Sequence, residues 1–305
     1  MTFETITVTS SGATSVAEFV PGAAMLCCSW RARGDELLDP GNGVEAYAAQ
    51  GKTMAIPLLY PWANRLAGYG YSAAGRQVTL PEDPARIAPD PNGLPIHGIV
   101  PGLIRFAPQP PERDDQLLAT LAWNAKELLE LYPFEHEVRL SVTAQDDALT
   151  IAVTVRATGS EPVPVSFGFH PYVRIPGSNR TTWRLELPPA DHLQLDDKMI
   201  PTGEHEPAPD GEVALADSSW DDAYRPHEQP ARYAVSDDRH RIELTFDEGF
   251  PFSQIYAPPG KDFICFEPMT APTNALASGD QLPVVDPGSE YRAAFSLRYR
   301  NKGVE

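Results

Sequence analysis

Hydrophobic and polar residues alternate along several stretches of the chain, and this alternation predicts β-strands. Apolar residues occupy every second position over 138–142 and again over 149–155, with the polar residues 145–147 between the two runs. Because successive side chains of a strand point to opposite faces, the pattern predicts two half-buried antiparallel strands joined as a hairpin. The same alternation returns over 242–246 and over 291–299, which we expect to be two further strands.

Shorter apolar runs add strands, whereas helical patterns are scarce. Four runs predict strands at 25–30, 117–123, 163–169 and 263–266, and only Ala125–Tyr132 has a helical pattern. The 32 prolines and 22 glycines favour many turns and few long helices. The chain is therefore predicted to be mostly β, built from antiparallel strands.

Three stretches rich in proline or charge, 81–95, 108–116 and 201–211, interrupt these strands. We expect them to be loops and not interdomain linkers, because the spacing of strands resumes directly after each one. A β-sandwich can exceed about 200 residues as one unit. We therefore expect residues 1–305 to form a single domain.

The formal net charge of -18 narrows the range of partners. A nucleic-acid backbone or an anionic membrane surface would be repelled at long range, so neither is expected as a partner. An acidic surface is compatible with a small neutral ligand. It also serves solubility in many proteins, so the charge alone assigns no function.

The cysteines and the first residues predict the compartment. The chain has three cysteines, Cys27, Cys28 and Cys265, of which two are adjacent. An odd number with this spacing matches neither a disulfide framework nor a CxxC metal site. The first residues, 1–7, have neither a basic segment nor an apolar segment of a signal peptide, and no run of 18 apolar residues occurs. We expect reduced thiols and a cytoplasmic protein.

Two short segments each carry one titratable residue directly before a proline. His170 precedes Pro171 in Phe-Gly-Phe-His-Pro-Tyr, and Glu267 precedes Pro268 in Phe-Ile-Cys-Phe-Glu-Pro-Met. The proline ring restricts the preceding residue to extended backbone, which aims its side chain with less freedom than usual. An imidazole and a carboxylate can supply a proton donor and a proton acceptor near neutral pH.

Alternation predicts the surroundings of both groups. It places Ser166, Gly168 and His170 on one face, where small side chains leave room beside the imidazole, although a glycine there can also mark a bulge. The strand before Glu267 is apolar on both faces, so we expect this carboxylate beside a buried strand with a raised pKa. An alternative is a structural salt bridge between Glu267 and an arginine.

Five of the other six histidines are interpreted as structural, hydrogen-bonded or solvent-facing groups. Their spacing matches no metal motif such as HExxH, so no metal site is expected. These residues are His136, His192, His205, His227 and His240.

Three further segments combine polar donors with aromatic residues. Asn64 and Arg65 follow Trp62, His97 lies between a proline-isoleucine pair and a glycine, and Asp221 lies in Trp-Asp-Asp-Ala-Tyr. Guanidinium donors, carboxylate acceptors and aromatic faces together are typical of a sugar-binding site. None of these segments is specific by itself.

The order of the motifs along the chain is specific. Five segments follow one another in the order and spacing of the aldose 1-epimerase (galactose mutarotase) family, which the chain resembles over nearly its whole length. These segments are Asn64-Arg65-Leu66, Ile96-His97-Gly98, Gly168–Tyr172, Trp220–Tyr224 and Phe266–Thr270. The resemblance implies a large antiparallel β-sandwich, the galactose mutarotase-like supersandwich, with a concave sugar-binding face.

The resemblance also implies roles for individual residues. Glu267 would be the general base and His170 the general acid, while Arg65, His97 and Asp221 would bind or orient the sugar. Asn64 and Trp62 would be wall residues. Asp222 is adjacent to Asp221, so which of the two contacts the sugar stays open.

The implied activity is interconversion of the α and β anomers of a free aldose through acid/base ring opening and reclosure. This chemistry needs no metal, nucleotide or redox cofactor, and its partner is a small monosaccharide. The sequence does not tell which aldose is preferred, or whether the protein is a monomer or a homodimer.

Three alternatives remain at this point. A hexose-6-phosphate or other modified-sugar epimerase would need converging arginines, for which Arg76, Arg86 and Arg105 are available, although the acidic chain disfavours an anion. A non-catalytic sugar-binding module would not need both His170 and Glu267. A glycoside hydrolase would use two carboxylates, such as Glu267 and Asp221, and would leave the histidine without a role.

Overall fold

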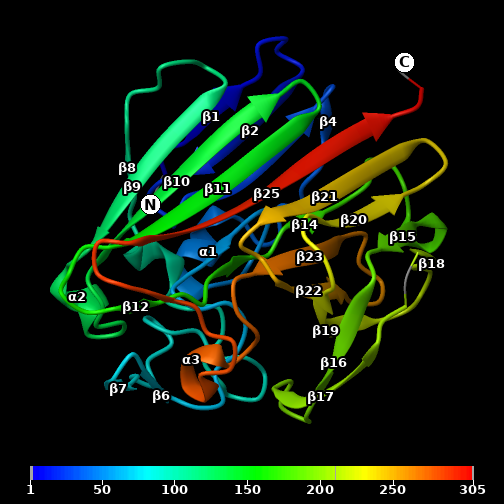
Figure 1. The fold of residues 1–305 in the computed structure, drawn as a ribbon. Coiled ribbons are helices and arrows are strands. Elements are labelled where there is room, and N and C mark those ends of the chain that lie inside the picture. Colours follow the sequence, from blue (N-terminus) through cyan, green and yellow to red (C-terminus); the bar gives the residue numbers. More distant parts are fainter. Residues whose placement is uncertain (1–2, 210, 304–305) are drawn as a thin grey trace.

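Two large antiparallel sheets are stacked on each other in this computed structural model, which describes residues 3–209 and 211–303 (Figure 1). Strands account for 48% of the chain and helices for 7%, so the prediction of a mostly β fold is confirmed. The two stacked sheets form the large antiparallel β-sandwich that the resemblance implied.

The first sheet has nine strands and contains the long alternating segments of the sequence. The predicted hairpin is confirmed, with Val138 opposite Val155 and the turn at 146–147. In spatial order the strands are β18 (Gly211–Ala214), β15 (Arg184–Leu187), β20 (Ala231–Ser236), β21 (His240–Glu248), β25 (Glu290–Asn301), β11 (Ala148–Ala157), β10 (His136–Gln145), β9 (Gln116–Trp123) and β8 (Ala107–Pro108).

The second sheet has eight strands and lies below the first in Figure 1. In spatial order they are β17 (Pro201–Pro207), β16 (Ala190–Leu195), β19 (Trp220–Pro226), β22 (Phe252–Ala257), β23 (Ile264–Met269), β13 (Gly168–Phe169) and β5 (Leu58–Leu59), and β14 (Tyr172–Val173) also pairs with β23.

The side chains of β23 point alternately toward and away from the first sheet. Phe266 faces the first sheet, with its ring 5.3 Å from that of Tyr233 in β20. Because side chains alternate along a strand, Cys265 and Glu267 lie on the opposite, outer face of the second sheet. That outer face carries the candidate site.

Smaller elements surround the two sheets. A four-stranded sheet contains β1 (Ile6–Thr9), β2 (Ser15–Val20), β3 (Leu26–Ala32) and β4 (Asp35–Glu36), and two-stranded sheets are formed by β6 (Gly70–Ala73) with β7 (Arg76–Thr79) and by β12 (Val163–Pro164) with β24 (Val284–Val285). The helices are α1 (Val44–Gln50), α2 (Lys126–Leu129), α3 (Ala275–Ser278) and the 3₁₀ turns η1 (Pro101–Leu103) and η2 (Arg180–Thr182). In the part of the chain that the structure describes, no helix is long and apolar enough to span a membrane.

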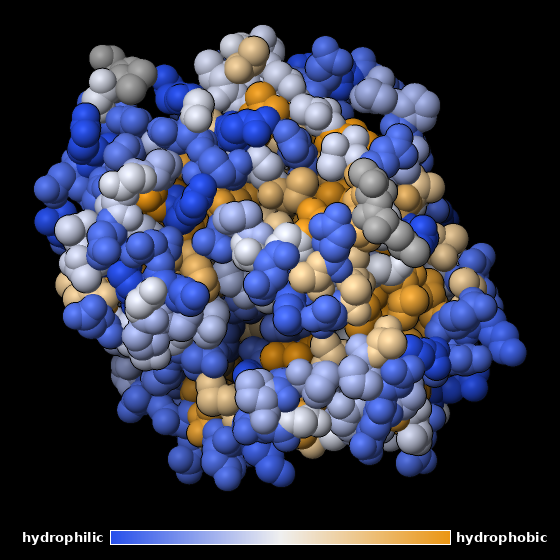
Figure 2. All heavy atoms as spheres, turned by 180° about the vertical axis from the view of Figure 1, so that it is seen from behind, coloured by the Kyte–Doolittle hydropathy of each residue, from blue (hydrophilic) through white to orange (hydrophobic). Residues whose placement is uncertain are grey.

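The surface is mainly hydrophilic on the face seen from behind. Figure 2 shows one face of the molecule covered mainly by hydrophilic residues, with separated apolar patches between them. All three cysteines are free, and Cys27 and Cys265 are buried.

The prediction of one continuous strand over 163–169 is wrong. Residues 163–164 pair with β24 and residues 168–169 pair with β5, so the segment changes partner midway. Pro164 cannot donate a backbone hydrogen bond, which weakens a continuous ladder at this point. His170 lies just beyond β13, whereas Glu267 lies inside β23 and not after it.

Two other predictions need correction. The stretch 201–211 was expected to be a loop, but 201–207 form β17, an edge strand whose exposed side chains give no alternating signal; residue 210 lies outside the described residues. The helical pattern at 125–132 shrinks to α2, while α1 and α3 were not predicted because they are too short to develop a periodic apolar face. Residues 81–95 contain no strand or helix, as expected for a loop.

His136 is buried in the core between the sheets and is hydrogen-bonded, in agreement with a structural role. Its Nδ1 lies 2.6 Å from the carbonyl oxygen of Phe134, its Nε2 lies 2.5 Å from the hydroxyl of Tyr60, and its ring stacks on Trp123. These contacts fit a neutral imidazole that donates from Nδ1 and accepts at Nε2. Burial lowers the pKa of His136 to about 4, although the hydrogen bond to Phe134 opposes this.

This burial predicts how stability depends on pH. An unfolded histidine titrates near about 6.5, so between that pH and about 4 the unfolded chain binds a proton that the folded chain does not. The free energy of unfolding should therefore fall as the pH drops from 7 to 5. His136→Gln should remove about 1–2 kcal/mol of this pH-dependent loss, measured by urea unfolding at both pH values.

An equal loss in the wild type and in His136→Gln would contradict the buried, neutral state of His136.

Candidate active site

The register of the second sheet brings His170 and Glu267 together. Gly168 is opposite Met269, and Tyr172 is opposite Cys265. Both pairs belong to the same antiparallel register, which places His170 opposite Glu267. His170 Nε2 lies 3.1 Å from Glu267 Oε1, and only 5% of the histidine and 2% of the glutamate is exposed. The two residues singled out in the sequence thus converge on one site.

Buried polar atoms without partners accompany this contact. His170 Nδ1, Glu267 Oε2 and Gln254 Oε1 have no hydrogen-bond partner among the described residues. Buried polar groups in folded proteins are nearly always hydrogen-bonded, and exceptions gather at functional sites. The unpartnered atoms make the contact between His170 and Glu267 a candidate ligand site.

Aromatic rings fix the imidazole of His170. The ring of Tyr172 stacks on it with a centroid separation of 4.4 Å and an angle of 3° between the planes. The Tyr172 hydroxyl lies 2.7 Å from Thr53 Oγ1, which holds the tyrosine in place. The ring of His97 approaches His170 edge-on, with a centroid separation of 5.4 Å.

Burial opposes charge on both members of the pair. It raises the pKa of Glu267, and Asp221 raises it further, whereas Arg65 acts in the opposite direction. Burial also lowers the pKa of His170, and His97 adds to this effect. Both directions favour a carboxylic acid at Glu267 beside a neutral imidazole at His170. The raised pKa of Glu267 was expected, whereas the sequence argument placed a protonated imidazole beside a carboxylate.

The structural salt bridge considered for Glu267 is not formed with an arginine. Among the ion pairs of residues 3–209 and 211–303, the partner of Glu267 is His170. Arg65 is close enough to lower the pKa of Glu267, but its own ion-pair partner is Asp90.

Two irregular segments carry Arg65 and His97 and pair with each other. Arg65 forms an antiparallel bridge with Ile96, and the backbone N–H of His97 donates to the carbonyl oxygen of Asn64 at 2.9 Å. Asn64 and His97 have left-handed backbones, with φ of 56° and 61°. Such conformations are costly for residues other than glycine and persist where the surroundings enforce them.

Gly98 explains why the turn after His97 needs a glycine. Its φ is +80°, and a Cβ at this position would lie 2.0 Å from the carbonyl oxygen of Tyr60. The close approach of these two backbones therefore excludes any side chain at residue 98.

The guanidinium of Arg65 is held from two directions. Its Nε donates to Asp90 Oδ2 at 2.7 Å, and its Nη1 donates to Asn64 Oδ1 at 3.0 Å. Asn64 is buried and its side-chain oxygen is occupied by Arg65. Trp62 is completely buried, and its Nε1 has no hydrogen-bond partner among the described residues, so its role as a wall residue stays a prediction.

Asp221 lies beside the pair, and its neighbour Asp222 does not. Gln254 is opposite Glu267 in the register of β22 and β23, and its Nε2 donates to Asp221 Oδ1 at 2.7 Å. Asp222 instead pairs with His192 Nε2 at 3.2 Å. Burial raises the pKa of Asp221, although the hydrogen bond from Gln254 and the charge of Arg65 oppose this.

Sequence reasoning missed Gln254 and Asp90. Gln254 reaches the site only through its pairing with Glu267, and Asp90 only through a contact between two loops. Neither residue lies in a distinctive motif, so local sequence patterns carry no signal for them.

The room expected beside His170 does not come from Gly168. A Cβ at residue 168 would lie 2.6 Å from the carbonyl oxygen of Pro268 and 2.9 Å from the Cβ of Ala63. This glycine permits a close backbone approach, and no open space is left there for a ligand.

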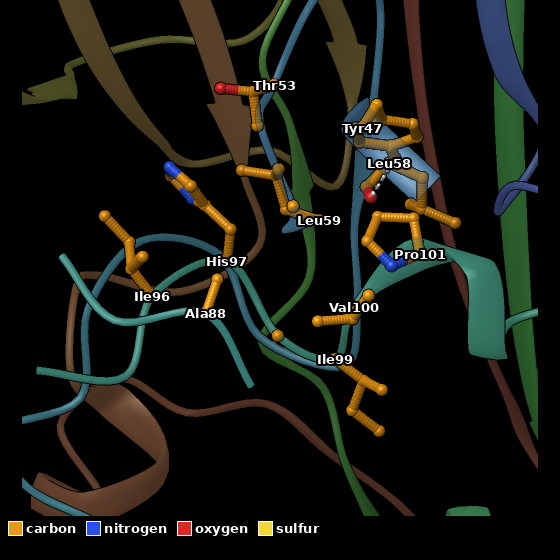
Figure 3. Close-up of a pocket in the computed structure, with 12 residues that line it drawn as sticks. Tyr47, Thr53, Leu58, Leu59, Ala88, Ile96, His97, Ile99, Val100 and Pro101 are labelled. Atoms are coloured by element: carbon orange, nitrogen blue, oxygen red, sulfur yellow. Dashed lines mark hydrogen bonds between the residues drawn. The ribbon is translucent and has the colours of Figure 1, made fainter. Parts of the chain in front are cut away.

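A small cavity adjoins His97 (Figure 3). Its volume is about 10 Å³, and Tyr47, Leu58, Leu59 and Val100 are among its lining residues. Figure 3 shows the ring of His97 extending away from Val100 and Pro101 at the edge of this cavity. A volume of this size matches about one water molecule, so the cavity is too small for a sugar ring.

Comparisons with known proteins identify the family. The family described as aldose 1-epimerase matches residues 4–298. The protein Slr1438 from Synechocystis sp. PCC 6803 has a similar structure, with a TM-score of 0.78 and 26% sequence identity over 99% of this chain and 97% of that one.

Two further similarities agree with this match. A galactose 1-epimerase from Lactobacillus acidophilus NCFM shares the fold, with a TM-score of 0.73 and 12% identity over 98% of this chain and 99% of that one. The uncharacterized protein YihR of Escherichia coli K12 is 22% identical over 86% of this chain and 89% of its own length. By the family match over residues 4–298, this chain belongs to the aldose 1-epimerase family.

Proposed function

We propose that the protein is a mutarotase, which interconverts the α and β anomers of a free aldose by opening and reclosing the ring. The observation that carries this proposal is the buried contact of 3.1 Å between His170 Nε2 and Glu267 Oε1, with further unpartnered polar atoms on both side chains. An acid and a base in contact suit a reaction that removes one proton and delivers another.

The distance between the two groups matches the geometry of the substrate. Ring opening takes a proton from the anomeric hydroxyl and gives one to the ring oxygen, and both oxygens are bonded to the same carbon. The acid and the base must therefore be neighbours. The contact of 3.1 Å supports His170 and Glu267 acting side by side on these two neighbouring oxygens.

In the proposed mechanism Glu267 accepts the proton of the anomeric hydroxyl while His170 donates a proton to the ring oxygen. The bond between C1 and the ring oxygen breaks, the open aldehyde rotates about C1–C2, and reclosure with reversed roles gives the other anomer. Each positioned acid or base typically contributes about 10²–10⁴-fold to the rate.

His170 and Glu267 hold one proton between them in two forms. In the uncharged pair it is on Glu267, and in the ion pair it is on His170. Transfer of that proton from Glu267 to His170 converts the uncharged pair, which burial favours, into the ion pair that starts the reaction. Arg65 favours this transfer, because its charge lowers the pKa of Glu267.

Four side chains around the pair suit the hydroxyl groups of a sugar. Arg65 and His97 provide nitrogen donors, and Asp221 and Gln254 provide oxygen acceptors within the same site. Asn64 acts through Arg65, because its oxygen already accepts a hydrogen bond from the guanidinium.

A hexose-6-phosphate epimerase is less compatible with the arrangement of the arginines. Arg76 pairs with Glu161, and Arg86 pairs with Glu130. Arg105 lines a surface groove with Phe3 and Phe106. These three side chains thus have separate partners and surroundings, and the charge of Arg65 is balanced by Asp90.

Glu267→Gln should reduce mutarotation by at least about 100-fold, because the amide cannot accept the proton. His170→Asn should cause a comparable loss. Polarimetry of freshly dissolved single anomers of glucose, galactose and a hexose 6-phosphate measures both effects and the preferred sugar. Glu137→Gln, on the exposed side of the other sheet, is a matched control with unchanged activity. Near-normal activity of Glu267→Gln in a folded protein would exclude the proposed role.

Asp221→Asn should shift the acidic limb of the pH profile of kcat/KM to lower pH. The charge of Asp221 raises the pKa of Glu267, so its removal lets Glu267 ionise at a lower pH. Asp222→Asn is the control, since Asp222 pairs with His192 and not with Gln254. A shift to higher pH, or equal profiles for the two variants, would contradict this electrostatic arrangement.

Arg65→Ala should mainly raise KM, since the guanidinium is proposed to bind the sugar in both the ground state and the transition state. Initial rates over a range of sugar concentrations separate the two constants. A loss of kcat at unchanged KM would show that Arg65 acts only in the transition state.

A further inference from the structure

Asp90 is a buried carboxylate that the proposed chemistry does not use directly. Its side chain is 0% exposed, and that of its partner Arg65 is 11% exposed. Charged side chains are seldom buried unless they are paired and hydrogen-bonded. The hydrogen-bond partners of Asp90 therefore indicate what its buried carboxylate does.

The two oxygens of Asp90 bind different partners. Oδ2 accepts the Nε–H of Arg65 at 2.7 Å. Oδ1 accepts the backbone N–H groups of Asn92 at 2.8 Å and Leu94 at 2.9 Å. One carboxylate thus links the guanidinium to the backbone of the turn that follows residue 90.

This turn leads directly to His97. The backbone N–H of Asp90 donates to the carbonyl oxygen of Leu94, and residues Pro89 and Pro95 bridge the base of the turn. Two residues later, His97 hydrogen-bonds to the backbone of Asn64. Asp90 therefore fixes both the side chain of Arg65 and the segment that carries His97.

Asp90 is charged in this environment. Burial alone would raise its pKa, but the hydrogen bonds from Arg65 and from the backbone of Leu94 and Asn92 outweigh burial and lower it. The result is a buried ion pair whose geometry is fixed by hydrogen bonds on every side.

We propose that Asp90 is the positioning residue of the sugar site, which holds Arg65 and the His97 turn in the geometry that binds the sugar. The inference rests on the proposed function for the role of Arg65. Within the described residues no hydrogen bond uses Arg65 Nη2, so this end of the guanidinium remains for a sugar oxygen.

Asp90→Asn tests the proposal, because the amide can still accept the turn hydrogen bonds through its oxygen while the charge that orients Arg65 is lost. KM should rise on the order of tenfold, with a smaller change in kcat. In the Arg65→Ala background the same substitution should change KM by less than about twofold, because the two residues act as a unit.

Asp83→Asn is the matched control. Asp83 also accepts a backbone hydrogen bond, from Ala85, but on an exposed turn, and KM should be unchanged. If Asp90→Asn does not fold, Asp90→Glu keeps the charge and displaces the carboxylate by one methylene, and it should show the same coupling to Arg65. A wild-type KM in either folded variant, or a rise in KM that adds fully to that of Arg65→Ala, would overturn the proposal.

A second readout does not depend on catalysis. In ¹⁵N NMR spectra, the Nε–H of Arg65 should exchange slowly with water in the wild type and at least tenfold faster in Asp90→Asn. Equal exchange rates would overturn the proposal even if the wild type had mutarotase activity. Slow exchange in a wild-type protein without mutarotase activity would instead reject the proposed function and retain the link between Asp90 and Arg65.

Discussion

The site depends on one contact, in which His170 Nε2 and Glu267 Oε1, both buried, lie 3.1 Å apart. Neither group is stable as an isolated charge in such surroundings, because burial raises the pKa of Glu267 and lowers that of His170. The register of the second sheet enforces the contact, since the strands before and after His170 both pair with β23. The fold thereby holds an acid and a base side by side in surroundings that oppose charge on either group alone.

The groups around this contact are held by backbone geometry as much as by side chains. Asn64 and His97 adopt left-handed conformations, and Gly98 lets the two loops approach closely. The positive charge of Arg65 is balanced by Asp90, and a buried charge left without its partner would be strongly destabilising. Few of the charged side chains are buried, so most of the net charge of -18 lies on the surface, where it does not attract an anionic partner.

Much of this arrangement could be predicted from the sequence. Alternation predicted the hairpin of β10 and β11, and the apolar run before Glu267 predicted a buried strand, because both depend only on local sequence pattern. The motifs before Pro171 and Pro268 predicted the pair itself. Gln254 and Asp90 could not be predicted, since their roles arise from strand register and from a contact between loops. Gly168 was misjudged for the same reason, because the backbone that fills its space comes from elsewhere in the chain.

The most direct test of the account is a crystal structure of Glu267→Gln with a bound aldose. The substitution conserves the shape of the side chain and allows an intact sugar to remain in the site. The account predicts that the anomeric oxygen lies within hydrogen-bonding distance of residue 267 and that the ring oxygen lies within the same distance of His170. A sugar bound elsewhere, or bound with its anomeric carbon away from these two residues, would contradict the account.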